Sequence, residues 1–194
     1  AVKIFAAAIA RPELESLASA LEASRLRLTR LDAALMGWWH QLRELALPAL
    51  AQGRGMVLFE QAGSWDCLMV EAGEPLMARG LGSRLEAMDL GREITLSLLN
   101  AELESSPAPL EALVVVADAE PDAGCIETLA VAAGVRPEFV ARERLGVPGL
   151  GGARRDLLPE RLDLVPKAWR EQELRQNKRR RFMLGLGMGA LLWA

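Results

Sequence analysis

The hydrophobic positions of this chain follow two spacings, one typical of β-strands and one typical of α-helices. Continuous or alternating apolar runs predict strands at residues 2–9, 26–31, 56–60, 65–71, 75–80, 111–117 and 135–141. Apolar residues that recur every three to four positions predict helices at residues 12–24, 33–45, 84–104 and 125–133. Strands and helices therefore alternate along most of the chain, which predicts an α/β fold.

The middle of the chain has a β-rich pattern of its own. The three strands predicted between residues 56 and 80 are joined by Ala62-Gly63-Ser64 and Ala72-Gly73-Glu74. Connections this short that contain glycine are typical of hairpins, so we expect an antiparallel meander. The strand predicted at residues 111–117 is instead a continuous valine-rich run, which is typical of a strand buried on both faces.

The C-terminal part of the chain changes abruptly from basic to uncharged at Phe182. Its basic residues are Lys167, Arg170, Arg175, Lys178, Arg179, Arg180 and Arg181. A basic cluster directly before an apolar run is the arrangement that keeps the basic side in the cytoplasm. We therefore expect residues 182–194 to start a single membrane-crossing helix, although a complete span needs roughly 20 residues. The alternative is an apolar helix that docks on the domain or on a partner.

Residues 146–152 (GVPGLGG) are rich in glycine and predict a linker. We expect an α/β domain at residues 1–145, a linker at 146–165, and a basic juxtamembrane segment with the start of a membrane helix at 166–194. The apolar run at 2–9 begins almost at the first residue of the sequence. We therefore expect the α/β domain to be the second half of a larger one.

Charge and composition exclude several classes of function. The net charge is -3 and the isoelectric point is near 5.4, so nothing general indicates nucleic-acid binding, and the basic cluster favours anionic lipid headgroups. Cys67 and Cys125 lie far apart without a CxxC pattern, which favours ordinary thiols in a reducing compartment. His40 is the single histidine, which disfavours histidine metal sites and a catalytic triad. We expect His40 to pack against the domain or to face water.

Two further features are candidates for binding. Asp118, Glu120 and Asp122 follow a predicted strand, where open α/β sheets bind ligands, although a solvated loop is the more ordinary reading. Of the neighbouring tryptophans, we assign Trp39 to the core, and Trp38 is a candidate surface anchor for a partner. Packing in the core remains the alternative for Trp38.

The order of elements and three phrases resemble the actin-like proteins of bacterial type IV pilus and type II secretion systems, the PilM and GspL group. The phrases are LEASRLRLTRLDAALMGWW (21–39), EPLMARGLG (74–82) and LDLVPKAWREQELRQNKRRRF (162–182). The last phrase resembles the juncture before the membrane helix in GspL and in PilN. The resemblance implies an actin-like (RNase H-like) lobe followed by a linker and a basic helix that enters the membrane.

Two loops depart from the pattern of an active actin-like ATPase. Residues 60–64 (EQAGS) lack the Asp-x-Gly turn that holds metal and phosphate in such enzymes. Residues 119–124 contain one glycine in place of a glycine-rich adenosine loop, and no GxxxxGK[ST] segment occurs. We therefore predict that the chain does not hydrolyse nucleotide and is not an enzyme, with no catalytic residue, cofactor or metal ligand.

The resemblance implies a membrane-anchored scaffold of the inner-membrane assembly platform of a secretion or pilus system. Its expected partners are a cytoplasmic motor ATPase, other platform subunits and a second copy of itself. Its expected location is the bacterial inner membrane, with a cytoplasmic domain. The alternative function is a nucleotide-binding actin-like ATPase whose first lobe is absent from this chain. A third reading is an unrelated soluble α/β domain whose apolar tail is a docking helix.

Overall fold

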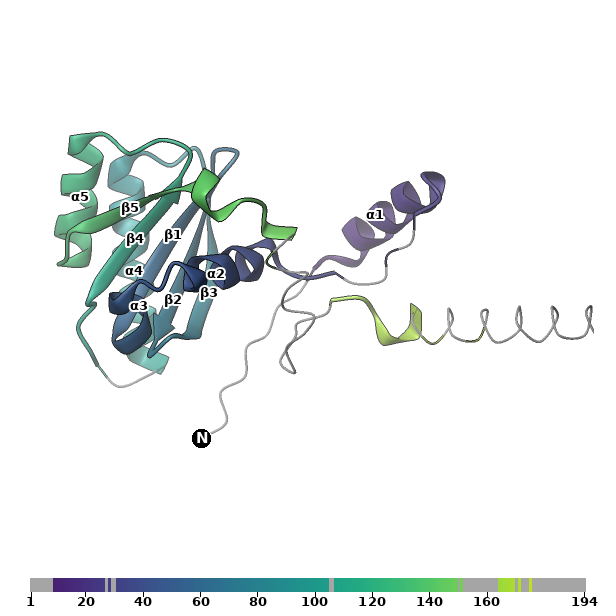
Figure 1. Cartoon of the computed structure of the whole chain (residues 1–194), viewed down its shortest axis with the longest axis horizontal. Helices are drawn as coiled ribbons and strands as arrows, with labels where there is room; N and C mark the ends of the chain where they lie inside the picture. The colour runs from purple at the N-terminus through teal and green to yellow at the C-terminus, as the bar shows by residue number, and fades with distance from the viewer. Residues whose placement is uncertain are drawn as a thin grey trace, which may run out of the picture. The chain divides into compact units, whose positions relative to one another are not determined.

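The computed structural model describes two compact units, which are coloured along the chain in Figure 1. The larger unit holds the described residues from Ala33 to Gly151, and the smaller holds those up to Asp32 and from Leu164 onward. The described residues are 9–26, 28, 31–104, 107–149, 151, 164–169, 171 and 175. The membrane helix predicted at 182–194 and nearly all of the strand predicted at 2–9 lie outside them. Within the described part of the chain, no helix combines the length and apolar character that a membrane span requires.

The larger unit is built on one five-stranded sheet with the order β3-β2-β1-β4-β5. Its strands are β1 (Arg54–Gln61), β2 (Ser64–Glu71), β3 (Glu74–Ser83), β4 (Ala112–Ala117) and β5 (Pro137–Ala141). Strands β1, β2 and β3 form the predicted antiparallel meander, and β4 and β5 continue the sheet parallel to β1. The sequence pattern therefore identified both the meander and the buried valine-rich strand.

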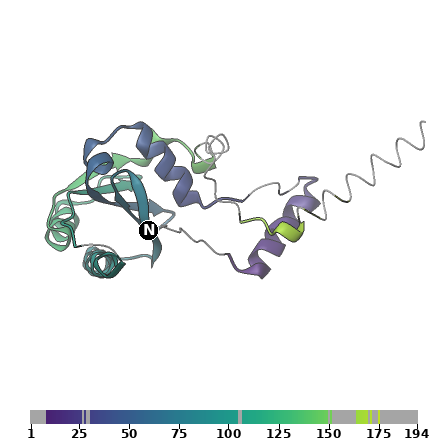
Figure 2. The same cartoon turned by 90° about the horizontal axis from the view of Figure 1, so that it is seen from below.

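Helices cover both faces of this sheet. Helices α2 (Ala34–Glu44) and α3 (Pro48–Gln52) lie on one face, and α4 (Ala87–Glu104) and α5 (Ala123–Ala133) lie on the other (Figures 1 and 2). A short 3-10 helix, η1 (Arg142–Leu145), follows β5. The sheet is therefore the middle layer of three, which is why its central strands are apolar on both faces.

Alternate residues of the central strands supply two separate cores. Val57 and Phe59 of β1 pack in the core beneath α2 and α3, together with Trp39 and Leu42. Met56 and Leu58 of the same strand pack in the core beneath α4 and α5. A strand projects successive side chains to opposite faces, so a continuous apolar run is the pattern that both cores require.

The two hairpin turns of the meander share one backbone geometry. Ala62 and Gly63 have φ values of 52° and 78°, and Ala72 and Gly73 have φ values of 51° and 79°. Two consecutive positive φ values match the twist of the flanking strands, and glycine adopts them without steric cost. The glycine in each turn is therefore placed where the hairpin needs it.

Some predicted boundaries differ from the structure. The helix predicted from residue 84 begins at Ala87, because β3 stays paired with β2 as far as Ser83. Helix α3 was not predicted; it is one short turn that buries Leu50. In the segment predicted as a strand at 26–31, the described residues Leu26, 28 and 31 are not in a strand.

The smaller unit joins two distant parts of the chain. Its helix α1 (Arg11–Ala23) has a proline in its first turn, as predicted, and buries Leu14. The backbone N–H of Leu164 donates to the carbonyl oxygen of Leu31 at 2.8 Å, and Val165 beside it is buried. The segment before the basic cluster is therefore held by a hydrogen bond to residues that follow α1.

The start of the predicted linker packs against α2 in the larger unit. The Nε2 of Gln41 donates to the carbonyl oxygen of Val147 at 2.7 Å. A Cβ added at Gly37 would lie 2.2 Å from the carbonyl oxygen of Pro148, and one added at Gly151 would lie 2.1 Å from the carbonyl oxygen of Gly37. The two backbones thus lie so close together that neither Gly37 nor Gly151 has room for a Cβ atom.

We expect Gly37→Ala to lower the free energy of unfolding by about 1–3 kcal/mol, because its methyl group overlaps the backbone of Pro148. Urea unfolding followed by circular dichroism measures the change. Gly149→Ala is the matched control, since a Cβ there meets nothing within 4 Å. Equal stability of the two variants would show that the close approach at Gly37 is not tightly constrained.

Candidate functional site

The carboxyl ends of the three parallel strands meet at one edge of the sheet. Open α/β sheets bind their ligands at this edge, so it is the first candidate site. Glu60 lies near the end of β1, Asp118 follows β4, and Arg142 follows β5. These three residues are distant in sequence, and the parallel pairing of β1, β4 and β5 brings them together.

Arg142 links all three strand ends. Its Nη1 donates to the carbonyl oxygen of Glu60 at 2.8 Å, and its Nη2 donates to the carboxylate of Asp118. The same Nη1 lies 3.9 Å from Oε2 of Glu60. The side chain of Arg142 is 20% exposed and that of Asp118 is 65% exposed. The contacts of Arg142 with Glu60 are therefore better shielded from water than its contact with Asp118. The single positive charge of the guanidinium therefore lies between the carboxylates of Glu60 and Asp118 and is shared by them.

The turn that would carry the phosphate-binding aspartate of an actin-like ATPase is closed by Glu60. Its Oε1 accepts a hydrogen bond from the backbone N–H of Gly63 at 2.7 Å. One carboxylate oxygen thus holds the β1–β2 turn while the other faces Arg142. Across the described ranges, no group of three or more His, Cys, Asp or Glu side chains has a geometry that could hold a metal ion.

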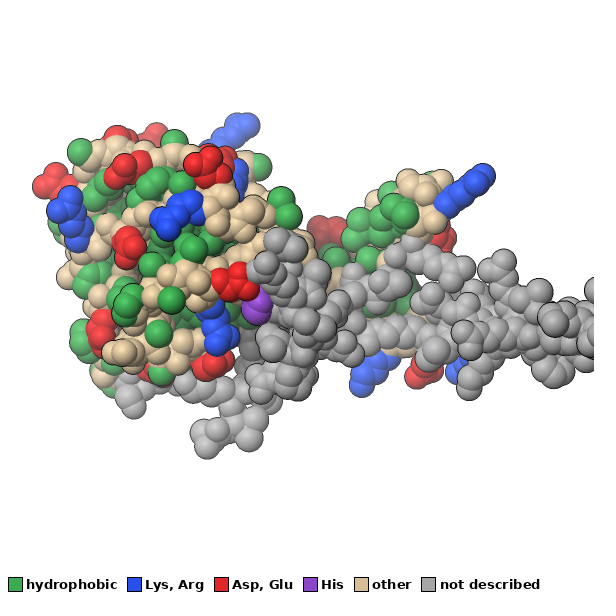
Figure 3. Space-filling model, viewed as in Figure 1, with side chains coloured by type: hydrophobic (Ala, Val, Ile, Leu, Met, Phe, Trp, Pro, Cys, Tyr) green, Lys and Arg blue, Asp and Glu red, His purple; other side chains and the backbone are tan. Residues whose placement is uncertain are grey.

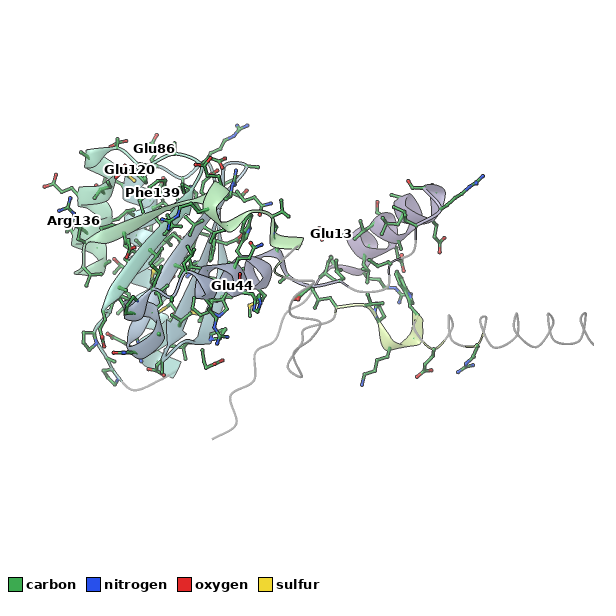
Figure 4. All side chains as sticks on the ribbon, viewed as in Figure 1. Glu13, Glu44, Glu86, Glu120, Arg136 and Phe139 are labelled. Atoms are coloured by element: carbon green, nitrogen blue, oxygen red, sulfur yellow. The ribbon has the colours of Figure 1, made fainter. Side chains whose placement is uncertain are left out.

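The predicted acidic cluster divides among three roles. Asp118 pairs with Arg142, as described above. Asp122 is the N-cap of α5, and its carboxylate accepts a hydrogen bond from the backbone N–H of Cys125 at 2.9 Å. Glu120 is exposed near the start of α5 (Figure 4). Two of the three carboxylates therefore have structural partners.

Trp38 lies in the core, not on the surface. It is 5% exposed, and its Nε1 lies 3.5 Å from Oε1 of Gln61 on β1. Trp39 is buried in the same core, as predicted. The interpretation of Trp38 as a surface anchor is wrong for this unit, because Trp38 packs in the same buried cluster as Trp39. His40 is partly exposed, with its Nε2 4.0 Å from the carboxylate of Glu44.

Two members of the predicted basic cluster are described, both in the smaller unit. Lys167 is exposed in a short helical turn, and Arg175 lies 3.6 Å from the carboxylate of Glu171. Arg170, Lys178, Arg179, Arg180 and Arg181 lie outside the described residues. The contact of this cluster with a membrane surface therefore stays a prediction. On the visible face of the larger unit, acidic and basic side chains are interspersed (Figure 3).

A pocket of about 340 Å³ lies where α2 and α3 meet the β2–β3 turn. Its size is near the lower end of sites that hold small molecules. Its apolar lining includes Trp39, Leu42, Leu47 and Leu50. Two charged side chains, Arg43 and Glu74, also line it. No sequence pattern indicated this pocket, because its walls come from segments about 20 to 35 residues apart that only the fold brings together.

Comparison with known proteins gives similarity at the level of structure alone. No protein-family model matches the sequence, and no curated protein matches it either. A chain of the PilM-PilN type IV pilus biogenesis complex is similar in structure, with a TM-score of 0.55 and 18% identity, over 70% of this chain and 50% of that one.

The fold of this chain is actin-like. The sequence resemblance implied this fold, and the structural similarity at a TM-score of 0.55 supports it. The membrane helix expected beside it lies outside the described residues.

Two other solved structures are more distant. The ethanolamine utilization protein EutJ from Carboxydothermus hydrogenoformans has a TM-score of 0.37 and 12% identity, over 58% of this chain and 52% of that one. A protein from Sinorhizobium meliloti assigned as a 2-dehydro-3-deoxygalactonokinase has a TM-score of 0.34 and 13% identity, over 66% and 60%. This chain therefore spans between 50% and 60% of the length of the three chains compared.

The prediction that this chain is not an enzyme does not stand, and a protein assigned as a kinase is among the more distant structures. The prediction rested on two loop sequences, residues 60–64 and 119–124. Missing sequence motifs in two loops do not exclude an enzymatic activity for a chain of this fold. At a TM-score of 0.34, the likeness also identifies no reaction for this chain.

We expect Arg142→Met to lower the free energy of unfolding by about 1–3 kcal/mol, because it leaves the shielded carboxylate of Glu60 without its cation. Urea unfolding measures the loss. Arg144→Met is the matched control, since Arg144 is exposed in the same 3-10 helix. If both variants unfold at the same urea concentration, Arg142 does not stabilise this edge.

Burial raises the pKa of the Cys67 thiol to about 12, and the hydrogen bond with Ser97 only partly offsets it. An unfolded cysteine has a pKa near 8.5, so the folded state holds this proton more tightly. The tighter proton binding stabilises the folded state relative to the unfolded one. This stabilisation is fully present below about pH 8.5 and is lost as the pH rises towards 12.

At pH 8, we therefore expect a thiol reagent such as DTNB to modify the partly exposed Cys125 in the folded protein and both cysteines in urea. In a Cys125→Ser variant, labelling should proceed only as fast as the protein unfolds. Rapid labelling of that variant in buffer would contradict the burial of Cys67.

Proposed function

We propose that this protein is an assembly component of a bacterial type IV pilus or type II secretion system. The observation that carries the proposal is the fold similarity to a chain of the PilM-PilN type IV pilus biogenesis complex, at a TM-score of 0.55. At 18% identity this similarity is one of fold. The three sequence phrases that resemble the PilM and GspL group are the second line of support.

The proposed attachment is to the inner membrane, through the C-terminal segment. The sequence changes from a run of four basic residues, 178–181, to an uncharged apolar run at Phe182. Each basic residue near an anionic membrane surface contributes about 1 kcal/mol of attraction. The apolar run would supply the insertion, and the basic residues would keep the α/β domain on the cytoplasmic side.

The proposed partners of the larger unit are a motor ATPase and other platform subunits. The unit offers them a rigid surface, because its sheet is buried on both faces and Arg142 ties three strand ends together. Charges of both signs occur on the visible face (Figure 3), so recognition there would depend on shape and local pairing and not on one charged patch.

The test is chemical crosslinking with mass spectrometry on the full-length protein in its native membranes. An amine-reactive reagent would report on Lys167 and Lys178, and a carboxylate-reactive reagent would report on the 26 Asp and Glu residues. We expect crosslinks to a secretion or pilus motor and to inner-membrane platform subunits. Recovery with unrelated cytosolic proteins only would contradict the proposal.

A charge variant separates membrane attachment from partner binding. Replacing Arg179, Arg180 and Arg181 by Glu should reduce the amount of protein in the membrane fraction, because it reverses the charge beside the apolar run. The matched control makes the same replacement at Arg25, Arg27 and Arg30, which precede Ala33 in the sequence and lie far from the apolar run. If both variants stay in the membrane fraction to the same extent, the basic cluster does not direct attachment.

A further inference from the structure

The pocket beside α2 and α3 is separate from the strand-end site described above. Its walls come from the C-terminal half of α2, from α3 and from the β2–β3 turn. Glu60, Asp118 and Arg142 build the strand-end site, and none of them lines this pocket. The pocket is therefore a second place where the larger unit could hold a ligand.

Backbone contacts tie the two walls of the pocket together. The N–H of Ala72 in the β2–β3 turn donates to the carbonyl oxygen of Gly53, directly after α3, at 3.0 Å. A Cβ added at Gly73 would lie 3.6 Å from the carbonyl oxygen of Ala51, which is an ordinary van der Waals contact. Because the turn is bound to the end of α3 by its backbone, the pocket is formed before any ligand arrives, as in most small-molecule sites.

Most of the pocket lining is apolar. Trp39, Leu42 and Leu50 line it and are buried, and Leu47 is half-buried beside them. Removal of apolar surface from water is the main source of affinity for a small ligand at such a lining. The pocket therefore favours a ligand that carries an aliphatic or aromatic group.

Two charged side chains of opposite sign line the same pocket. Arg43 and Glu74 are both exposed, and neither side chain has an ion-pair or hydrogen-bond partner among the residues that the structure describes. The neighbouring Glu71, by contrast, pairs with Arg54 at 2.8 Å. One cation and one anion are thus available to a ligand in a space of about 340 Å³.

We propose that this pocket binds a free α-amino acid with an apolar side chain. The ligand's side chain packs against Leu42, Leu47 and Leu50. Its carboxylate pairs with Arg43, and its ammonium group pairs with Glu74. An α-amino acid carries both charges on one carbon beside an apolar group, so one small molecule matches all three features. The volume suits this ligand, because about 340 Å³ is near the lower end of small-molecule sites.

A protein segment, from a partner or from a longer form of this chain, matches the pocket less well. The interior of a peptide backbone carries no charge, and each end of a peptide carries only one. A stable protein contact also extends over about 800 Å² on each partner, which is far more than a pocket of this size offers. The inference does not depend on the proposed role in a pilus or secretion system.

Titration of the full-length protein with L-leucine, followed by saturation-transfer-difference NMR of the ligand, tests the site. We expect a dissociation constant in the millimolar range, because exposed ion pairs add little affinity. Glycine has the same two charges without an apolar side chain, so it should bind about tenfold or more weakly. Absence of saturable L-leucine binding in the millimolar range, or equally tight binding of glycine, would overturn the proposal.

Two variants and two ligand analogues assign the charges. Arg43→Met should weaken the binding of L-leucine by about fivefold, but it should not weaken that of L-leucinamide, which lacks the carboxylate. Glu74→Gln should also weaken the binding of L-leucine by about fivefold, but not that of N-acetyl-L-leucine, which lacks the ammonium group. If the two side chains pair with each other and not with the ligand, this selectivity is lost and the proposal fails.

The matched controls are Arg92→Met and Glu102→Gln, since both residues are exposed on α4 and do not line the pocket. Neither control should change the affinity for L-leucine. All four substituted side chains are exposed, so the variants should fold, and circular dichroism checks that they do. Equal affinities of Arg43→Met and Arg92→Met, or of Glu74→Gln and Glu102→Gln, would overturn the proposal.

Discussion

The larger unit depends on one constraint: a central strand must feed two hydrophobic cores at once. Strand β1 sends Val57 and Phe59 to the core beneath α2, and Met56 and Leu58 to the core beneath α4. It is also the strand where the antiparallel meander joins the parallel part of the sheet. A polar residue in the middle of β1 would bury an unpaired polar group in one core or the other. The strand pairing, the helical layers and the strand-end cluster therefore all depend on this run.

The same constraint explains why the fold was visible in the sequence. A valine run such as Val114 to Val116 has few other uses in a water-soluble domain, and glycines at positions 63 and 73 allow the tight hairpins around it. The end of β3 was less visible, because it depends on the pairing of Ser83 with Ser64 across the sheet. The predicted strand therefore ended at Gly80, three residues before the observed one.

The candidate site was less predictable than the fold. The strand-end position of Asp118 could be read from the sequence, but its partner Arg142 could not, because their contact depends on the parallel register of β4 and β5. The burial of Trp38 was missed for a similar reason. Adjacent residues of a helix point in directions about 100° apart, yet both tryptophans of α2 belong to one buried cluster here. Sequence motifs alone were also insufficient to exclude an enzyme.

The close backbone approach between α2 and the segment after η1 has a mechanical meaning. A tension applied to the chain beyond Gly151 would first reach the contacts of Gly37 with Pro148 and Gly151, and of Gln41 with Val147. The load would then enter the domain through α2 and its tryptophan-rich core. The edge strand β5 would be spared from peeling away one hydrogen bond at a time. The contacts of Gly37 would therefore carry the force before it reached the strands of the sheet.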